Sequence, residues 1–252
     1  MCLILLVHRV VDGYPLLLAA NREESYSRPT APPQLHVGPP RVVCGTDLLA
    51  GGTWLAVNEY GLVAAVTNRP YQHAPREPRS RGLLCRDVAR MCNAADALEL
   101  AREELANDCY AGVNLLVADP QQAWVLSAAE RMSVERLEPG MHLLAAGNAN
   151  DPHDARLARV RRMFGSKPAP TAEEFCRRAR TICSLPAGED GPAILLRRPG
   201  GGTVSSTILT LADKREASQF WHAPGPPDQT PYHNLSHLLH ALWSAQSHKP
   251  AE

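Results

Sequence analysis

The sequence has few aromatic residues, no net charge and no long apolar run. Aromatic residues make up 5% of the 252 residues, and 26 basic residues balance 26 acidic ones. This balance excludes the electrostatic footprint of a protein that binds nucleic acid or an anionic membrane. No stretch approaches the length of a membrane span, and the apolar residues 3–7 are too few for the core of a signal peptide. We therefore expect a cytoplasmic protein with no nucleic-acid partner and no membrane span.

The cysteine pattern excludes two further classes of protein. Seven cysteines form an odd set without a Cys-x-x-Cys pair, so neither a disulfide framework nor a zinc-finger spacing is indicated. A reducing compartment fits this pattern best, and no metal site is predicted. The Gly51-Gly52-Thr53 segment lacks the lysine and the spacing of a phosphate-binding loop.

Length and composition favour one domain. The apolar content of 44% and the charged content of 21% are ordinary for a globular protein. The sequence has no internal repeat and no convincing linker, so we expect a single domain over residues 1–247, followed by a disordered tail over residues 248–252. Nothing in the sequence indicates the oligomeric state.

Hydrophobic periodicity predicts strands and helices in separate blocks. Residues 28–40 hold five prolines and are interpreted as an irregular loop. The predicted strands cover residues 3–7, 16–20, 53–57, 62–67, 113–118, 123–127, 142–146, 194–196, 205–211 and 219–222. The predicted helices cover residues 81–91, 94–105, 154–163, 171–182 and 233–244. This order is typical of an α+β fold in which two stacked antiparallel sheets lie between helices, a four-layer αββα sandwich.

Cys2 is the first candidate for catalysis, because it directly follows Met1. If Met1 is removed, Cys2 carries both a thiol and a free α-amine, whose reference pKa values of about 8.5 and about 7.7–8.0 allow easy proton exchange. Such a residue is a nucleophile with its own base. The alternative interpretation is a buried cysteine that acts as a small hydrophobic residue.

Polar residues follow the second predicted strand. Asn21, Arg22, Glu23 and Glu24 end this strand, which a hairpin turn would bring beside Cys2. Arg22 is a suitable partner for a thiolate, and Glu24 shares its strand face. An ordinary salt bridge at the strand end is the alternative.

Other strand ends supply amides and hydroxyl groups. Asn68 follows Thr67 directly before a turn and is able to donate a hydrogen bond to an oxyanion. Asn148 and Asn150 lie in a second turn, and Ser206 lies in a strand with hydroxyl groups on both faces. Each of these also has a purely structural interpretation in turns or helix caps.

Taken in order, these motifs resemble the NRDE family, whose members are transport-and-Golgi-organisation-like proteins. The resemblance rests on Met1-Cys2-Leu3, Asn21-Arg22-Glu23-Glu24, Gly51-Gly52-Thr53-Trp54 and Thr67-Asn68. The namesake motif is Asn-Arg-Asp-Glu, and Glu23 replaces its aspartate. The family is similar in turn to N-terminal-nucleophile (Ntn) hydrolases of the choloylglycine hydrolase and penicillin V acylase type, which implies an Ntn-hydrolase-like αββα fold.

The resemblance implies a cysteine amidohydrolase that cleaves a non-peptide C–N bond of a small molecule. The predicted enzyme needs no cofactor. The predicted catalytic residues are Cys2, Arg22, Glu24, Asn68 and Asn148, and the predicted substrate-binding residues are Asn21, Glu23, Thr67, Asn150 and Ser206. Which of Asn148 and Asn150 faces the site is left open, and so is the substrate.

Two departures keep an alternative open. The hydrolase group spaces its arginine and acidic residue three apart, whereas Arg22 and Glu24 are two apart. The group also carries an arginine just after its Ser-Ser strand, whereas no arginine lies near Thr207. The alternative is a non-catalytic carrier of a small molecule, with haem or lipid as cargo. His233 and His237, four residues apart on a predicted helix, are its candidate ligands, although a surface helix with scattered histidines is the favoured interpretation because no cysteine or carboxylate cluster accompanies them.

Overall fold

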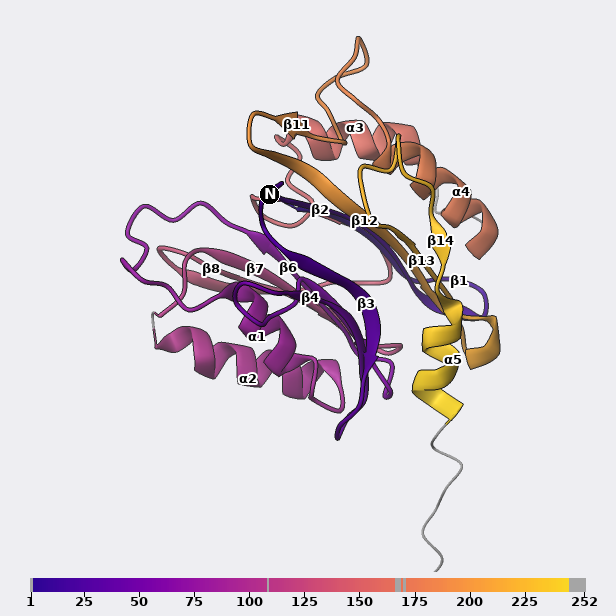
Figure 1. Cartoon of the computed structure of the whole chain (residues 1–252), viewed down its shortest axis with the longest axis horizontal. Coiled ribbons are helices and arrows are strands. Elements are labelled where there is room, and N and C mark those ends of the chain that lie inside the picture. The colour runs from indigo at the N-terminus through magenta and orange to yellow at the C-terminus, as the bar shows by residue number, and fades with distance from the viewer. Residues whose placement is uncertain (1, 108, 166–168, 170, 245–252) are drawn as a thin grey trace, which may run out of the picture.

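The structure is a computed structural model that describes residues 2–107, 109–165, 169 and 171–244. Two antiparallel sheets stack face to face, and a pair of helices covers the outer face of each sheet (Figure 1). This arrangement confirms the predicted α+β sandwich of four layers. None of the described helices combines the length and the apolar character needed to cross a membrane.

The first sheet contains the start of the chain. The hairpin of β1 (Leu3–Val11) and β2 (Tyr14–Ser25) turns at Asp12 and at Gly13, whose φ of 72° suits glycine. The order of the sheet is β10 (Gly140–Leu144), β1, β2, β12 (Gly201–Leu211), β13 (Gln219–Ala223) and β14 (His233–Asn234), with β11 (Arg197–Arg198) paired to β12. All pairings are antiparallel.

The second sheet follows the order of the chain. Its strands are β3 (Thr30–His36), β4 (Val42–Asp47), β5 (Leu55–Asn58), β6 (Val63–Asn68), β7 (Val113–Ala118), β8 (Ala123–Ala128) and β9 (Met132–Arg136). The turn between β5 and β6 is closed by Asn58, whose side-chain oxygen accepts the backbone N–H groups of Tyr60 and Leu62.

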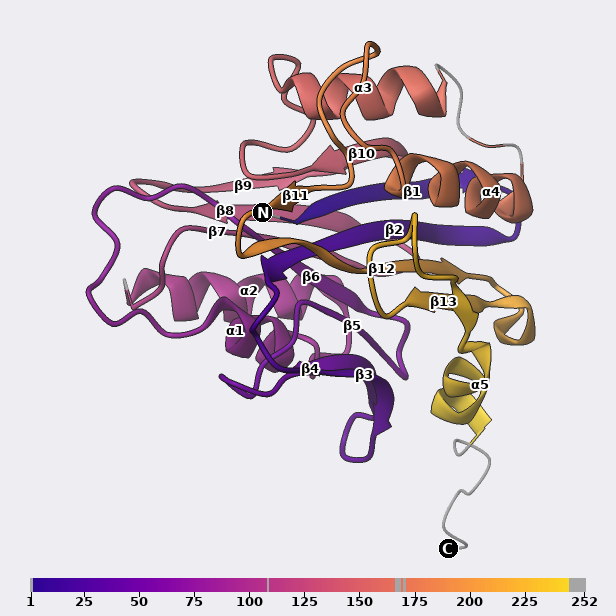
Figure 2. The same ribbon diagram turned by 45° about the horizontal axis from the view of Figure 1, so that its top comes forward.

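Capped helices cover the outer faces, as Figure 2 shows from a second direction. The helices α1 (Arg81–Val88) and α2 (Ala94–Ala106) pack on the second sheet, and α3 (Ala155–Phe164) and α4 (Ala172–Cys183) pack on the first. Asn93 and Thr171 are the N-caps of α2 and α4, because each side chain accepts a backbone N–H of the first turn. A 3₁₀ turn (Arg215–Ala217) and α5 (Ser236–Ser244) complete the described elements.

Strand alternation decides which side chains reach the space between the sheets. On β1 and β2, the even-numbered residues Ile4 and Leu18 join the core between the sheets, whereas Leu3 and Leu17 pack under α3 and α4. A side chain at an even-numbered position at this end of the hairpin, Cys2 included, is therefore directed toward the second sheet.

Two predicted elements are wrong. The proline-rich segment 28–40 contains β3, because Pro32 and Pro33 lie on an edge strand where a missing N–H is tolerated. Residues 194–196 form no strand, since the N–H groups of Ile194 and Leu195 both donate to the carbonyl of Leu185.

The last helix begins three residues later than predicted. It starts at Ser236, and the preceding His233 belongs to β14, where it pairs with His222. The predicted tail over residues 248–252 lies outside the described residues.

Candidate active site

A pocket of about 410 Å³ opens at the end of the sandwich where β1 begins and β2 ends. Cys2 lines this pocket and is half-buried. Burial raises the pKa of the Cys2 thiol above its ordinary value overall, and the backbone of Glu23 and the charge of Arg22 offset only part of this rise. Cys2 therefore combines access to a small molecule with a partly desolvated sulfur.

Arg22 is the first cation of the pocket. Its guanidinium donates to Thr30 Oγ1 over 2.7 Å and lies 4.1 Å from the centre of the Trp54 ring. These contacts hold the side chain over the face of an aromatic ring. Burial lowers the pKa of Arg22, while Glu24 and Cys2 raise it. Arg22 is thus fixed beside the sulfur, as strand alternation predicts.

Arg81 is a second cation of the pocket, which the sequence did not reveal. It is the first residue of α1, and its Nη1 donates to the carbonyl of Gly112 over 3.0 Å. Burial lowers the pKa of Arg81, while Cys2 and Glu24 raise it. Among the described residues, neither Arg22 nor Arg81 has a carboxylate ion-pair partner. The sequence contains no signal for Arg81, because residues of any type occur at the first position of a helix.

The start of α1 adds to the positive potential. Ser80, Arg81 and Gly82 line the pocket, and the helix begins at this wall. The N-terminal end of a helix carries a partial positive charge from its free N–H groups. A negative charge on the sulfur or on a bound molecule is therefore stabilised by the guanidinium groups of Arg22 and Arg81 and by the start of α1.

The acidic residues of the pocket are engaged with other groups. Arg28 binds Asp47 over 2.6 Å and lies 3.7 Å from Glu24, whose other oxygen accepts the N–H of Ser25. Although burial raises it, the pKa of Asp47 is lowered overall by Arg28. These pairs leave the net potential of the lining positive.

Asn21 and Glu23 use their side chains on the opposite face of β2. The Asn21 amide donates to the carbonyls of Cys183 and Ile194, at 2.9 Å and 3.4 Å. The Glu23 carboxylate binds the guanidinium of Arg156 on α3 through both oxygens. Both side chains thus fasten the helix layer to the sheet, and their predicted role in substrate binding stays a prediction.

Asn68 lines the pocket that contains Cys2, at the end of β6. Its neighbour Thr67 is buried, and the Thr67 hydroxyl donates to the carbonyl of Ala145 over 2.5 Å. The structure therefore brings Cys2, Arg22, Glu24 and Asn68 into one pocket, whose lining also includes Glu23. It places Thr67 in a link between the two sheets.

Asn148 and Asn150 do not line this pocket. The Asn148 side-chain oxygen accepts from Arg69 over 2.8 Å. Asn150, with a φ of 57°, exchanges hydrogen bonds with the backbone of Leu143 and so closes the turn after β10. The predicted roles of both residues at the site stay predictions.

Asn114 is a buried residue that organises this region and that the prediction missed as a site residue. Its amide donates to the carbonyls of Ala145 and Gly147 over 3.1 Å and 2.9 Å, and its oxygen accepts from Arg69 over 3.2 Å. Asn114 therefore holds the turn that carries Asn148. A polar residue inside the apolar run 113–118 is the signal that could have indicated this role.

Ser206 and the candidate haem ligands lie away from the Cys2 pocket. The Ser206 hydroxyl donates to the carbonyl of Ala20 and accepts from the Tyr232 hydroxyl. His233 and His237 are exposed, and they lie on different elements, so the predicted helical spacing does not exist. The described residues contain no group of three or more His, Cys, Asp or Glu side chains that could hold a metal ion.

Comparison with solved structures defines the fold. A conjugated bile acid hydrolase from Clostridium perfringens has a TM-score of 0.58 at 11% identity, over 94% of this chain and 93% of the hydrolase. A Caenorhabditis elegans ortholog of N-acylethanolamine-hydrolyzing acid amidase has a TM-score of 0.56 at 12% identity, over 91% and 98% of the two chains. The fold is that of Ntn hydrolases.

Sequence comparison identifies the family. Residues 1–173 match the family Transport and Golgi organisation 2, and the chain belongs to this family. The Bos taurus Transport and Golgi organization protein 2 homolog is 35% identical over 113 residues, which are 43% of this chain and 40% of the relative. The Drosophila melanogaster protein is 30% identical over 112 residues, at 41% and 40% coverage. The match therefore spans about two fifths of the length of these relatives.

Proposed function

We propose that this protein is an N-terminal cysteine amidohydrolase that acts on a small, negatively charged amide. The observation that carries the proposal is the position of Cys2 in a pocket of about 410 Å³, where the cations Arg22 and Arg81 raise the stability of a thiolate. Removal of Met1 would give Cys2 the free amine that such an enzyme uses as its base.

The reaction follows from these groups. The Cys2 amine takes the thiol proton, and the thiolate attacks the amide carbonyl carbon. The resulting oxyanion is stabilised by Asn68, by the start of α1 and by the two guanidinium groups. The C–N bond then breaks, and the leaving amine takes the proton from the Cys2 ammonium group. Water hydrolyses the thioester, which releases a carboxylic acid and restores Cys2.

The polarity of the pocket favours an anionic substrate. Arg22 and Arg81 face a cavity whose described carboxylates already contact other groups, so an incoming carboxylate would meet uncompensated positive charge. Arg81 is proposed to bind this group, and Arg22 to orient the sulfur.

The test is a combination of intact mass and activity. Protein with Cys2 as its first residue is compared with protein that retains Met1, on a panel of N-acyl amino acids and lactams. We expect hydrolysis only after removal of Met1, and we expect Cys2→Ala to abolish it. Arg102→Gln is the matched control, since Arg102 is an exposed arginine of α2. Equal hydrolysis with and without Met1 would contradict the mechanism.

A further inference from the structure

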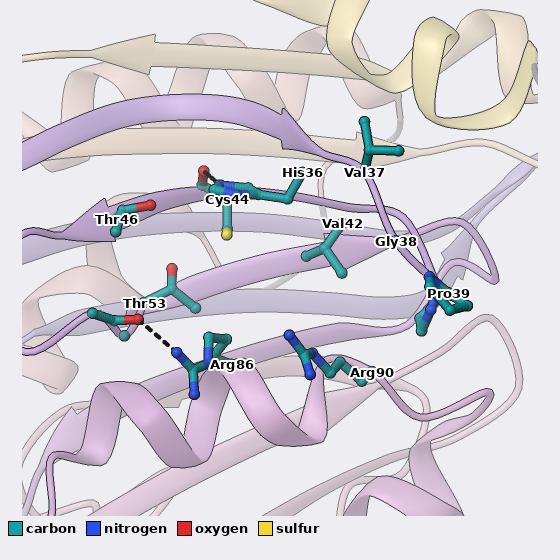
Figure 3. A pocket seen from close by; sticks show the side chains of 13 residues that line it. His36, Val37, Gly38, Pro39, Val42, Cys44, Thr46, Thr53, Arg86 and Arg90 are labelled. Atoms are coloured by element: carbon teal, nitrogen blue, oxygen red, sulfur yellow. Dashed lines mark hydrogen bonds between the residues drawn. The ribbon is translucent and has the colours of Figure 1, made fainter.

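A second pocket, of about 460 Å³, lies on the outer face of the second sheet, between β4 and the end of α1. The α1 helix covers β5 and β6 but leaves the outer face of β4 partly open. Figure 3 shows the Cys44 sulfur directed from β4 into this space and the side chains of Arg86 and Arg90 reaching toward it from the opposite side. The volume is in the usual range for small-molecule sites, about 300–1,000 Å³.

One wall of the pocket is apolar. Val42 and Cys44 project from β4, and Val37, Pro39 and Pro40 from the β3–β4 connection form the rim. Burial raises the pKa of the Cys44 thiol to about 11, so this sulfur is neutral at ordinary pH. An apolar group placed against this wall would be removed from water without burying a charged side chain.

The opposite wall is cationic. Arg86 donates to the carbonyl of Gly51 over 3.0 Å, and its nearest acid, Asp87, is 3.4 Å away and binds Arg79 more closely, over 2.6 Å. Arg90 is exposed and has no ion-pair partner within the described part of the chain. Among the described residues, no acidic side chain lines the pocket, and His36 of β3 contributes an imidazole to the lining.

We propose that this pocket binds a small organic monoanion with an apolar body, such as a carboxylate. The anionic group would lie between the guanidinium groups of Arg86 and Arg90, and the apolar body would lie against Val42, Cys44 and the proline rim. Guanidinium groups are suited to this role because they offer several N–H donors in one plane.

The pocket is separate from the Cys2 pocket but adjoins it through one residue. Thr53 lines both pockets, and the segment 51–53 forms the partition between them. Arg86 holds the carbonyl of Gly51 in this partition. The proposal concerns binding alone, so it does not depend on hydrolysis at Cys2.

The test is isothermal titration of the full chain with octanoate, and with 1-octanol as the uncharged match. We expect saturable binding of octanoate at one site and weaker binding of octanol. Arg86→Gln with Arg90→Gln should lower the octanoate affinity by about tenfold or more, because charge-assisted hydrogen bonds are lost. The control Arg102→Gln should leave the affinity unchanged.

Three results would overturn the proposal. They are the absence of saturable octanoate binding, equal affinity in the double variant, and binding that Arg81→Gln removes but the double variant retains. The last result would assign the ligand to the Cys2 pocket instead. The single variant Arg90→Gln, at an exposed position with no described ion pair, keeps the test valid if the double variant folds poorly.

Discussion

The backbones of Gly52 and Gly82 touch at the start of α1. A Cβ atom added to Gly52 would lie 2.2 Å from the carbonyl carbon of Gly82, and the N–H of Thr53 donates to the Gly82 carbonyl over 2.9 Å. This contact sets the helix start, and with it Arg81, against the wall of the Cys2 pocket. Two glycines thus determine where one cation of the candidate site lies.

Gly52→Ala should therefore destabilise the protein and displace Arg81. We expect a loss of about 1–3 kcal/mol in the free energy of unfolding, as for other overpacked sites, because the neighbouring atoms are backbone and have little freedom to move. Urea denaturation measures this loss. Gly140→Ala is the control, since its Cβ would meet no atom closer than 3.7 Å. Equal stability of the two variants would contradict the described contact.

The ion pair between Glu23 and Arg156 should be essential for stability. Its side chains are 2% and 12% exposed, so Arg156→Met would leave a carboxylate in a buried site without this partner. We expect a loss of about 3–5 kcal/mol, partly restored by the additional change Glu23→Gln. Arg177→Gln, which removes a 68% exposed side chain from its ion pair with Glu174, should cost less than about 1 kcal/mol. A loss from Arg156→Met no larger than that from Arg177→Gln would show that the pair is not buried.

His222 should make the protein sensitive to acid. Burial lowers the pKa of His222 from 6.5 to about 4, so between these values the unfolded chain binds a proton that the folded protein does not. The neutral His222 therefore stabilises the folded protein fully above the unfolded pKa. The free energy of unfolding decreases by about 3 kcal/mol as the pH falls through this window.

The comparison of His222→Asn with the original protein isolates this contribution. Unfolding free energies at about pH 7.5 and about pH 4.5 should differ less in the variant than in the original chain. His153→Gln, at an exposed position, should keep the original difference. An unchanged pH dependence in His222→Asn would exclude this histidine as its source.

The reactivity of Cys2 should depend on Arg22 and Arg81. Each cation favours the thiolate, so Arg22→Gln or Arg81→Gln should raise the pKa of the Cys2 thiol and slow its alkylation by iodoacetamide near neutral pH, by about tenfold. Peptide mass spectrometry separates Cys2 from the exposed Cys92, which serves as the internal reference. Equal slowing at both cysteines would indicate a change in folding rather than in the site.

Strand alternation was sufficient to predict part of the candidate site. Arg22 and Glu24 are even-numbered positions of β2, and Cys2 directly precedes the paired strand β1, so the sequence predicts their shared face without any tertiary information. Asn68 followed from its position after Thr67 at the end of a predicted strand, directly before a turn. The layer order followed from the blocks of helix and strand periodicity.

The remaining features depend on contacts that periodicity does not encode. Arg81 reaches the pocket because α1 packs against Gly52, which is distant in the sequence. The prolines of β3 are compatible with a strand only because that strand is at an edge, a property of the whole sheet. The hydrophobic residues Ile194 and Leu195 fold over the end of α4, where burial alone does not distinguish a strand from a loop.

The prolines of β3 have a further consequence for association between molecules. This strand is the outermost of its sheet, and Pro32 and Pro33 have no N–H to donate. A second chain that approached this border would find an interrupted row of donors, with a register shift between Ala31 and Gln34. The border is therefore a poor template for intermolecular strand addition, and aggregation along it is disfavoured.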